Sequence, residues 1–134
     1  MAKGGSMKKV LVIEDNSDNL RLITYALKRA GYEVIAARTG EEGVELASRE
    51  KPFIILMDIQ LPGIDGMEAT RRIRKFAAAH DVLIIAITSY AMGGDEEDIL
   101  AAGCNAYFEK PFDPLKIVEK IHKVMRKKNE DPVG

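Results

Sequence analysis

Short, continuously apolar runs alternate with helical patterns along most of the chain. The five runs are Val10–Ile13, Val34–Ala37, Phe53–Met57, Val82–Ile87 and Ala106–Phe108. Runs without polar alternation indicate parallel strands that are covered on both faces. A helical spacing of apolar residues follows each run. The pattern therefore predicts five consecutive strand–helix units.

Helix start and stop signals support the five helices. The expected start signals are Ser17 as a cap, the capping boxes Thr39 with Glu42 and Asp65 with Glu68, and Asp113-Pro114. The expected ends of the first and fourth helices are Gly31 and Gly103, with the fourth helix beginning near Asp95. The apolar faces are Leu20, Ile23 and Leu27 in the first helix, Ala69, Ile73 and Phe76 in the third, and Val118, Ile121 and Met125 in the fifth.

Tandem strand–helix units favour one fold class. Right-handed crossovers place successive parallel strands in a single sheet and put helices on both of its faces. The expected fold is a single doubly wound α/β domain with five strands and five helices. In such a sheet, ligands bind beyond the carboxyl ends of the strands.

Composition narrows the possibilities further. The 134 residues suffice for about one domain, and the net charge of −1 argues against a nucleic-acid-binding or membrane-surface protein. The single Cys104 excludes a disulfide framework, and the apolar runs are too short to cross a bilayer. We expect a cytoplasmic protein. We interpret residues 1–6 as an expression remnant, residues 8–127 as the domain and residues 128–134 as a frayed tail.

Candidate functional residues follow four of the five apolar runs. Glu14 and Asp15 follow the first, Asp58 the third, Thr88 the fourth and Lys110 the fifth. Each alone is more simply a turn residue, a helix cap or a loop lysine. Three converging carboxylates repel each other, however, and a hard divalent cation such as Mg²⁺ resolves that repulsion. A nearby hydroxyl and ammonium could donate hydrogen bonds to a phosphate. The set therefore predicts a magnesium-assisted phosphoryl site with Asp58 as a possible nucleophile.

Four motifs around these residues carry a family resemblance. They are VLVIEDN from Val10, MDIQLPGIDG from Met57, AITSYAM from Ala86 and FEKPF from Phe108. Together they resemble the receiver domain of two-component response regulators over residues 8–127. The resemblance implies the flavodoxin-like strand order 2-1-3-4-5. One departure is Leu83, which stands where many receivers have a proline entering the fourth strand.

The resemblance also implies a role for each strand-end residue. Asp58 would accept a phosphoryl group from the phosphohistidine of a histidine kinase or a histidine phosphotransfer protein. Asp15, Asp58 and the backbone carbonyl of Gln60 would bind Mg²⁺, with Mn²⁺ as an alternative, and Glu14 would reach the ion through water. Lys110, preceding a cis bond to Pro111, would pair with the phosphoryl oxygens.

The remaining implied roles concern switching. Thr88 would hydrogen-bond the phosphoryl group, and Tyr107 would turn inward as Thr88 moves. Gln60 and Tyr90 would tune the rate at which the phosphoryl group is lost. The protein would be a phosphoacceptor rather than an enzyme, with intrinsic magnesium-dependent self-phosphorylation from small donors and self-dephosphorylation.

The output is the least defined part of this interpretation. A lone receiver must bind a downstream protein target or relay its phosphoryl group. Acids at 95–98 and Lys116, Lys120 and Lys123 suggest a binding face, with homodimerisation on activation as one use. Alternatives are a receiver excised from a longer protein and a pseudo-receiver that binds partners without phosphorylation.

Other readings of the same residues fit less well. A haloacid-dehalogenase-type phosphatase needs an acid where Gln60 stands. A flavodoxin-like carrier needs a hydroxyl- and glycine-rich phosphate loop where Glu14 and Asp15 stand, and these acids would repel an anion. We expect His80 and His122 to be surface residues and Cys104 to be a small buried one. The basic run from Arg126 to Lys128 is expected to be a solvated helix end.

Overall fold

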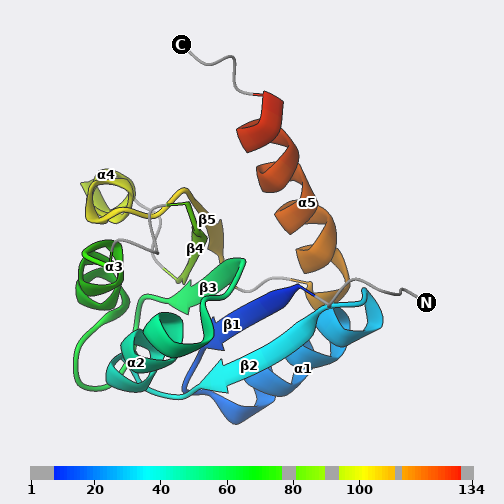
Figure 1. Ribbon diagram of the computed structural model, residues 1–134, viewed down its shortest axis with the longest axis horizontal. Coiled ribbons are helices and arrows are strands. Elements are labelled where there is room, and N and C mark those ends of the chain that lie inside the picture. Colours follow the sequence, from blue (N-terminus) through cyan, green and yellow to red (C-terminus); the bar gives the residue numbers. More distant parts are fainter. Residues whose placement is uncertain (1–7, 77–80, 90–93, 111–112, 131–134) are drawn as a thin grey trace.

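Five strands alternate with five helices in the computed structural model, which describes residues 8–76, 81–89, 94–110 and 113–130 (Figure 1). The strands are β1 (Lys9–Ile13), β2 (Glu33–Ala37), β3 (Ile54–Asp58), β4 (Leu83–Thr88) and β5 (Ala106–Glu109). The helices are α1 (Ser17–Arg29), α2 (Gly40–Glu50), α3 (Gly66–Arg74), α4 (Gly94–Ala102) and α5 (Pro114–Glu130). Each strand lies within one residue of its predicted bounds, and the doubly wound α/β fold is confirmed.

All neighbouring strands are parallel, in the order β2-β1-β3-β4-β5 that the family resemblance implied. Ile13 at the end of β1 is in register with Met57, and Asp58 at the end of β3 is in register with Ile87. Thr88 at the end of β4 is in register with Glu109. The carboxyl ends of the three central strands therefore form one edge of the sheet.

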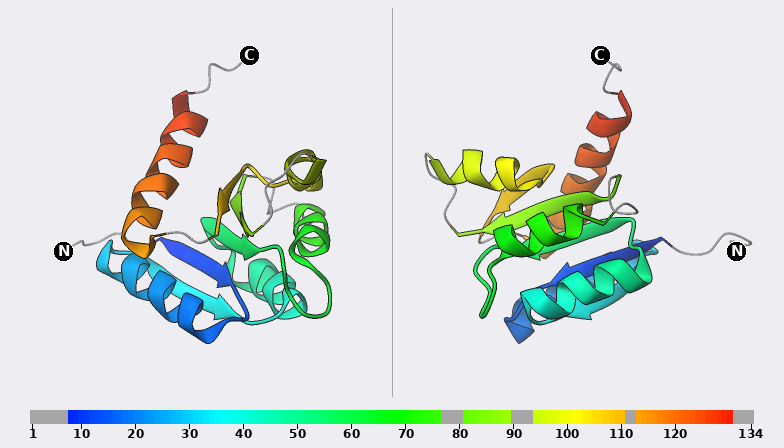
Figure 2. Two further views of the ribbon diagram at one scale, coloured as in Figure 1. Left: turned by 180° about the vertical axis from the view of Figure 1, so that it is seen from behind. Right: turned by 60° about the vertical axis from the view of Figure 1, so that its left-hand side comes forward.

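Helices cover both faces of the sheet and define two cores. Helices α1 and α5 pack on one face, where Ile23, Leu27, Ile117 and Ile121 meet the side chains of one strand face (Figure 1). Helices α2, α3 and α4 cover the other face, as the rear and side views show (Figure 2). The layered burial of apolar side chains is the dominant favourable term for this fold.

The edge strands are less buried than the central strands. All residues of β3 and β4 are buried, and β1 is buried except for the half-buried Lys9. In β2, by contrast, Glu33 and Ala36 are exposed, and Glu109 is exposed in β5. Both faces of the edge strands are nevertheless covered, because Val34 and Phe108 pack in the core under α1 and α5, while Ile35 and Tyr107 pack against the other core. The expectation of two covered faces is therefore confirmed, and the exposed residues lie at the rim of the helical layers.

The helix starts confirm the predicted positions but correct two details. Asn16, not Ser17, caps α1, because its side chain accepts a hydrogen bond from the backbone of Asn19. Thr39 and Asp65 cap α2 and α3 as predicted. Neither capping box is reciprocal, because the Glu42 carboxylate accepts the backbone N–H of Arg38, one residue before the cap, and the Glu68 carboxylate pairs with two arginines of α3.

The fifth helix differs from its prediction at both its face and its end. It begins at Pro114 as predicted, but Ile117 is buried while Val118 and Met125 are only partly so. It continues to Glu130 and so includes three residues that we had placed in the tail, whereas residues 131–134 lie outside the described part. His122 is not simply a surface residue: its Nε2 lies 2.9 Å from the hydroxyl of buried Tyr32.

Two further observations bear on the sequence analysis. Cys104 is free and buried, as expected. Among residues 8–76, 81–89, 94–110 and 113–130, no helix combines the length and the apolar character that a bilayer crossing requires. His80 lies outside the described residues.

Candidate functional site

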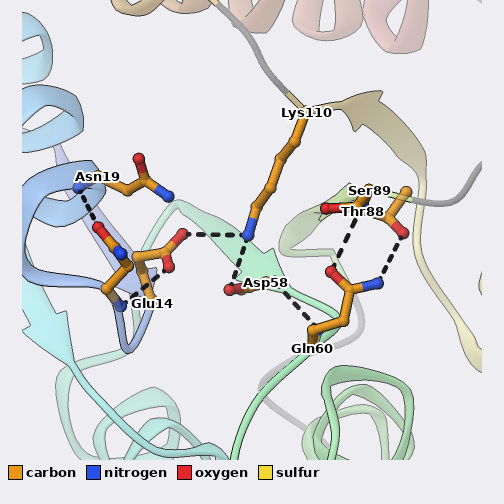
Figure 3. Close-up of polar contacts among 8 residues, drawn as sticks. Glu14, Asn19, Asp58, Gln60, Thr88, Ser89 and Lys110 are labelled. Atoms are coloured by element: carbon orange, nitrogen blue, oxygen red, sulfur yellow. Dashed lines mark hydrogen bonds and ion pairs between the residues drawn. The ribbon is translucent and has the colours of Figure 1, made fainter.

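The predicted acids and their partners meet at the carboxyl edge of the sheet (Figure 3). Glu14 directly follows β1, Asp58 ends β3 and Thr88 ends β4, and each of the three is only 1% exposed. Asp15 is exposed beside them. One ligand oxygen from each of Glu14, Asp15 and Asp58 lies within 4.8 Å of the others. The trio that sequence analysis inferred from strand ends is thus a cluster in space.

Lys110 reaches into this cluster from the end of β5. Its backbone N–H donates to the carbonyl of Thr88 at 2.8 Å, which fixes the start of the side chain beside the neighbouring strand. Its Nζ donates to Asp58 Oδ2 at 3.0 Å and lies 3.8 Å from Glu14 Oε1 (Figure 3). One ammonium therefore faces two buried carboxylates, and with Asp15 the acids outnumber it three to one.

The electrostatics of Glu14 show that the cluster is short of positive charge. Burial first, and then the negative charge of Asp58, raise the pKa of Glu14 from 4.5 to about 7. Its Oε2 accepts a hydrogen bond from the Asn16 backbone at 3.1 Å, which lowers the pKa only in part. Its Oε1 is buried without a hydrogen-bond partner among the described residues.

The oxygen atoms of this cluster are suitable ligands for a magnesium ion. Carboxylate and carbonyl oxygens with room for water are the ligands that Mg²⁺ takes in proteins. The open cavity at the cluster is about 750 Å³ and exposes polar side chains from the loop after β1 and the start of α1. Glu14 Oε1 is buried without a hydrogen-bond partner among the described residues, and the pKa of Glu14 is raised. A divalent cation nearby would stabilise the charged carboxylate and lower this pKa.

Gln60, in the loop after β3, contacts both Asp58 and the end of β4. Its backbone N–H donates to Asp58 Oδ1 at 3.0 Å. Its side chain contacts the β4 end, with Nε2 donating to Thr88 Oγ1 at 3.5 Å and Oε1 accepting from the Ser89 backbone at 3.4 Å (Figure 3). No acid stands at this position, so the side chain lacks the proton that a haloacid-dehalogenase-type general acid would donate.

Comparison with known proteins decides the family. The sequence model of the response regulator receiver domain matches residues 10–122, which is most of the chain. The chain belongs to the response regulator receiver family. The motifs that suggested this resemblance are the segments that place Glu14, Asp58, Thr88 and Lys110 at the strand ends.

Individual receivers are similar over nearly their whole length. The polar-differentiation response regulator DivK of Brucella anthropi is 40% identical over 114 residues, which are 85% of this chain and 93% of that protein. The chemotaxis response regulator CheY4 of Vibrio cholerae has a TM-score of 0.85 at 25% identity, covering 89% of this chain and 99% of that one. The receiver domain of the sensor histidine kinase PA1611 from Pseudomonas aeruginosa PAO1 has a TM-score of 0.80 at 38% identity, covering 90% and 97%. That structure holds a magnesium ion in its active-site cleft.

The structure adds residues to this receiver that the sequence analysis missed. Gln60 was predicted as a carbonyl ligand and a tuning position, but its side-chain bridge to Thr88 and Ser89 was not predicted. Arg38 donates to the backbone carbonyl of Asp15, a contact between two loops that no motif or spacing indicates. Tyr90 and Pro111 lie outside the described residues.

A charge-removing variant tests the repulsion in the metal-free receiver. With a chelator at pH 8, Glu14→Gln is expected to be more stable than wild type by about 2 kcal/mol, because it removes a buried charge whose pKa is raised. As the pH falls below 7, the folded wild-type protein takes up a proton at Glu14 before the unfolded chain does. The advantage of the variant should therefore shrink between pH 7 and pH 4.5.

Urea unfolding of both proteins at pH 8 and pH 5 measures this difference. Equal stability at pH 8, or an advantage that is undiminished at pH 5, would count against the electrostatic account of Glu14.

Proposed function

We propose that this receiver accepts a phosphoryl group on Asp58 and passes the signal on through a protein-binding face. The observation that carries the proposal is the placement of Asp58, buried at a strand end between two further acids and 3.0 Å from the Lys110 ammonium. A carboxylate in this setting is a nucleophile with a cation ready for the charge that arrives.

Phosphoryl transfer to Asp58 would form one bond to phosphorus and break another. A carboxylate oxygen of Asp58 attacks the phosphorus of a phosphohistidine, an O–P bond forms and the N–P bond breaks. The bond's electron pair stays on the histidine nitrogen, which takes up a proton, and Asp58 becomes an acyl phosphate. The donor is a histidine kinase or a histidine phosphotransfer protein, partners that receiver domains of two-component systems use. A small phosphodonor could replace it in self-phosphorylation.

The metal assignment is part of the proposal. Asp15, Asp58 and the backbone carbonyl of Gln60 would hold Mg²⁺, with Mn²⁺ as an alternative, and Glu14 would contact it through water. When bound, the ion would offset negative charge on the acids and on the phosphoryl oxygens. Support comes from the cluster of oxygens, from the raised pKa of Glu14 and from the magnesium in the similar Pseudomonas receiver.

Lys110 and Thr88 would respond to the new phosphoryl charge. The ammonium of Lys110 already donates to Asp58 Oδ2, so it needs to move little to follow a phosphoryl oxygen. The Thr88 hydroxyl accepts a weak hydrogen bond from Gln60 Nε2 at 3.5 Å, and its own O–H would donate to a phosphoryl oxygen. Gln60 and Tyr90 remain proposed tuning positions, and loss of the phosphoryl group to water would reset the receiver.

Magnesium-dependent phosphorylation of the wild-type chain tests the proposal. Incubation with phosphoramidate and Mg²⁺ should add the mass of one phosphoryl group, measured on the intact protein. The same mixture with excess chelator should add none within the same time. An unmodified protein in both mixtures, with folding verified by circular dichroism, would overturn the proposed function.

Switching is proposed to pass from Thr88 to Tyr107. Tyr107 on β5 pairs with Ala86, and Thr88 pairs with Glu109, so Tyr107 and Thr88 are diagonal neighbours on one face of the two strands. A hydrogen bond with the Glu96 carboxylate of α4 raises the pKa of Tyr107. An inward turn of Tyr107 would break this bond and release α4 from β5, which couples the phosphoryl site to the surface.

That surface has complementary charges on two helices. Glu96, Glu97 and Asp98 are exposed on α4, and three lysines, Lys116, Lys120 and Lys123, are exposed on α5. An acidic helix and a basic helix on opposite faces of the edge strand β5 suit a two-fold contact in which each meets its opposite. We therefore include a downstream protein target and homodimerisation on activation in the proposal, with the cytoplasm as the compartment.

Hydrogen exchange with and without beryllium fluoride, a phosphoryl mimic, tests this output. We expect altered protection between Thr88 and Lys123 in the activated protein, because Thr88 and Tyr107 change partners there. Unchanged exchange across this segment would contradict the switch. A monomer in sedimentation of the activated protein would remove the dimer from the proposal and leave the switch.

A further inference from the structure

Arg38 ties together two loops that flank the acid cluster. It is exposed and directly follows β2, next to the strand whose end carries Glu14 and Asp15. One guanidinium nitrogen donates to the backbone carbonyl of Asp15 at 2.8 Å and also to Ser17 Oγ at 2.8 Å. The contact therefore joins the loop after β2 to the loop after β1 and to the first residue of α1.

The backbone of Arg38 is itself held in place. Its N–H donates to Glu42 Oε1 at 2.9 Å, and Thr39 caps the helix that Glu42 belongs to. One residue earlier, the Ala37 carbonyl accepts the backbone N–H of Glu14 at 3.0 Å, which extends the pairing of β1 and β2. The backbone of Arg38 is thus fixed by hydrogen bonds, and its side chain extends from the end of β2 to the loop after β1.

Asp15 needs such support more than its neighbours do. Burial and a bond from Asn16 hold Glu14, and bonds from Gln60 and Lys110 hold Asp58. Asp15 is exposed, yet its carboxylate must stay within 4.8 Å of the other two to share a cation. The hydrogen bond to the Asp15 carbonyl restricts the backbone that carries this side chain. Binding of an ion therefore costs less conformational entropy.

We propose that Arg38 is a positioning residue that holds Asp15 in place for Mg²⁺. The inference rests on the proposed function, in which Asp15 is a direct magnesium ligand. Arg38 does not touch the ion in this account, and it acts through the Asp15 carbonyl.

Charge and position predict opposite effects for the loss of Arg38. A cationic side chain near the cluster disfavours a second cation, so its removal would strengthen Mg²⁺ binding by simple electrostatics. Removal of the hydrogen bond to Asp15 would instead weaken Mg²⁺ binding, since supporting partners of metal ligands commonly matter about tenfold or more. The sign of the change therefore separates positioning from charge.

Calorimetric titration with Mg²⁺ alone provides the test. Arg38→Met keeps a similar length without donors and is expected to weaken Mg²⁺ affinity by about tenfold. Arg38→Lys should fall between wild type and Arg38→Met, because a single nitrogen makes both bonds and an ammonium carries several donors. Arg21→Met, the same change at an exposed position of α1, should leave the affinity within about twofold.

Phosphorylation kinetics give a second readout. With Arg38→Met, the Mg²⁺ concentration for half-maximal phosphorylation by phosphoramidate should rise, while the rate at saturating Mg²⁺ should equal that of wild type. An affinity that is unchanged or increased in Arg38→Met overturns the inference. So does an affinity in Arg38→Lys as low as in Arg38→Met.

The two failures are distinguishable. If wild type binds Mg²⁺ and is phosphorylated but Arg38→Met behaves like it, the positioning role is wrong and the proposed function stands. If wild type neither binds Mg²⁺ nor gains a phosphoryl group, the proposed function itself is wrong. Unfolding of each variant in urea with a chelator verifies that the compared proteins are folded.

Discussion

Asp58→Asn is expected to abolish phosphorylation by small donors and by any histidine kinase that uses this receiver. Asparagine occupies the same space and keeps an oxygen for the Gln60 backbone N–H, which donates to Asp58 Oδ1 in the wild type. It carries no negative charge and is not a nucleophile toward phosphorus. The variant should also be at least as stable as wild type without metal, because one of the repelling acids is gone.

Intact mass after incubation with phosphoramidate and Mg²⁺ measures the effect. The matched control is Asp65→Asn, an exposed acid that caps α3, where asparagine caps equally well. The control should gain one phosphoryl group at the wild-type rate. A gain by Asp58→Asn at that rate would mean that another residue is the acceptor.

Asp15→Asn is expected to weaken Mg²⁺ affinity by at least about tenfold, because it removes one charged oxygen ligand from the proposed site. Asp58 remains chemically intact in this variant. Phosphorylation should therefore be slow at low Mg²⁺ and recover as Mg²⁺ is raised, which distinguishes a metal defect from a lost acceptor.

Asp18→Asn is the control for this prediction. Asp18 is an exposed acid that lines the same cavity but is not one of the three clustered carboxylates. Its Mg²⁺ affinity should stay within about twofold of wild type, since an exposed charge interacts weakly across solvent. Equal weakening in both variants would show that general negative charge, and not ligation by Asp15, sets the affinity.

The fold followed from the sequence because its signals are local and repeated. Continuous apolar runs and the alternation of strand with helix suffice for a parallel sheet with helices on both faces. The clustering of Glu14, Asp58 and Thr88 followed from the same fact, since carboxyl ends of parallel strands share one edge. The strand order and the role of each acid, in contrast, came from the resemblance to receivers.

The features that the sequence analysis did not predict correctly depend on the contacts of single side chains. Asn16 and Ser17 are both favoured helix caps, and sequence preference does not decide between adjacent residues. Glu68 was predicted to reach back to the helix start but pairs with arginines one turn on. The bridge from Gln60 to Thr88 and that from Arg38 to Asp15 join loops far apart in the chain, so no periodicity indicates them.

Mapping the modified residue tests the central claim most directly. The wild-type receiver is phosphorylated with phosphoramidate and Mg²⁺ and treated with borohydride, which reduces an acyl phosphate to an alcohol. Its peptides are then sequenced by mass spectrometry. The account predicts a reduced side chain at residue 58 alone. Reduction at Glu14 or Asp15, or an unreduced Asp58 in protein that carries a full phosphoryl mass, would contradict it.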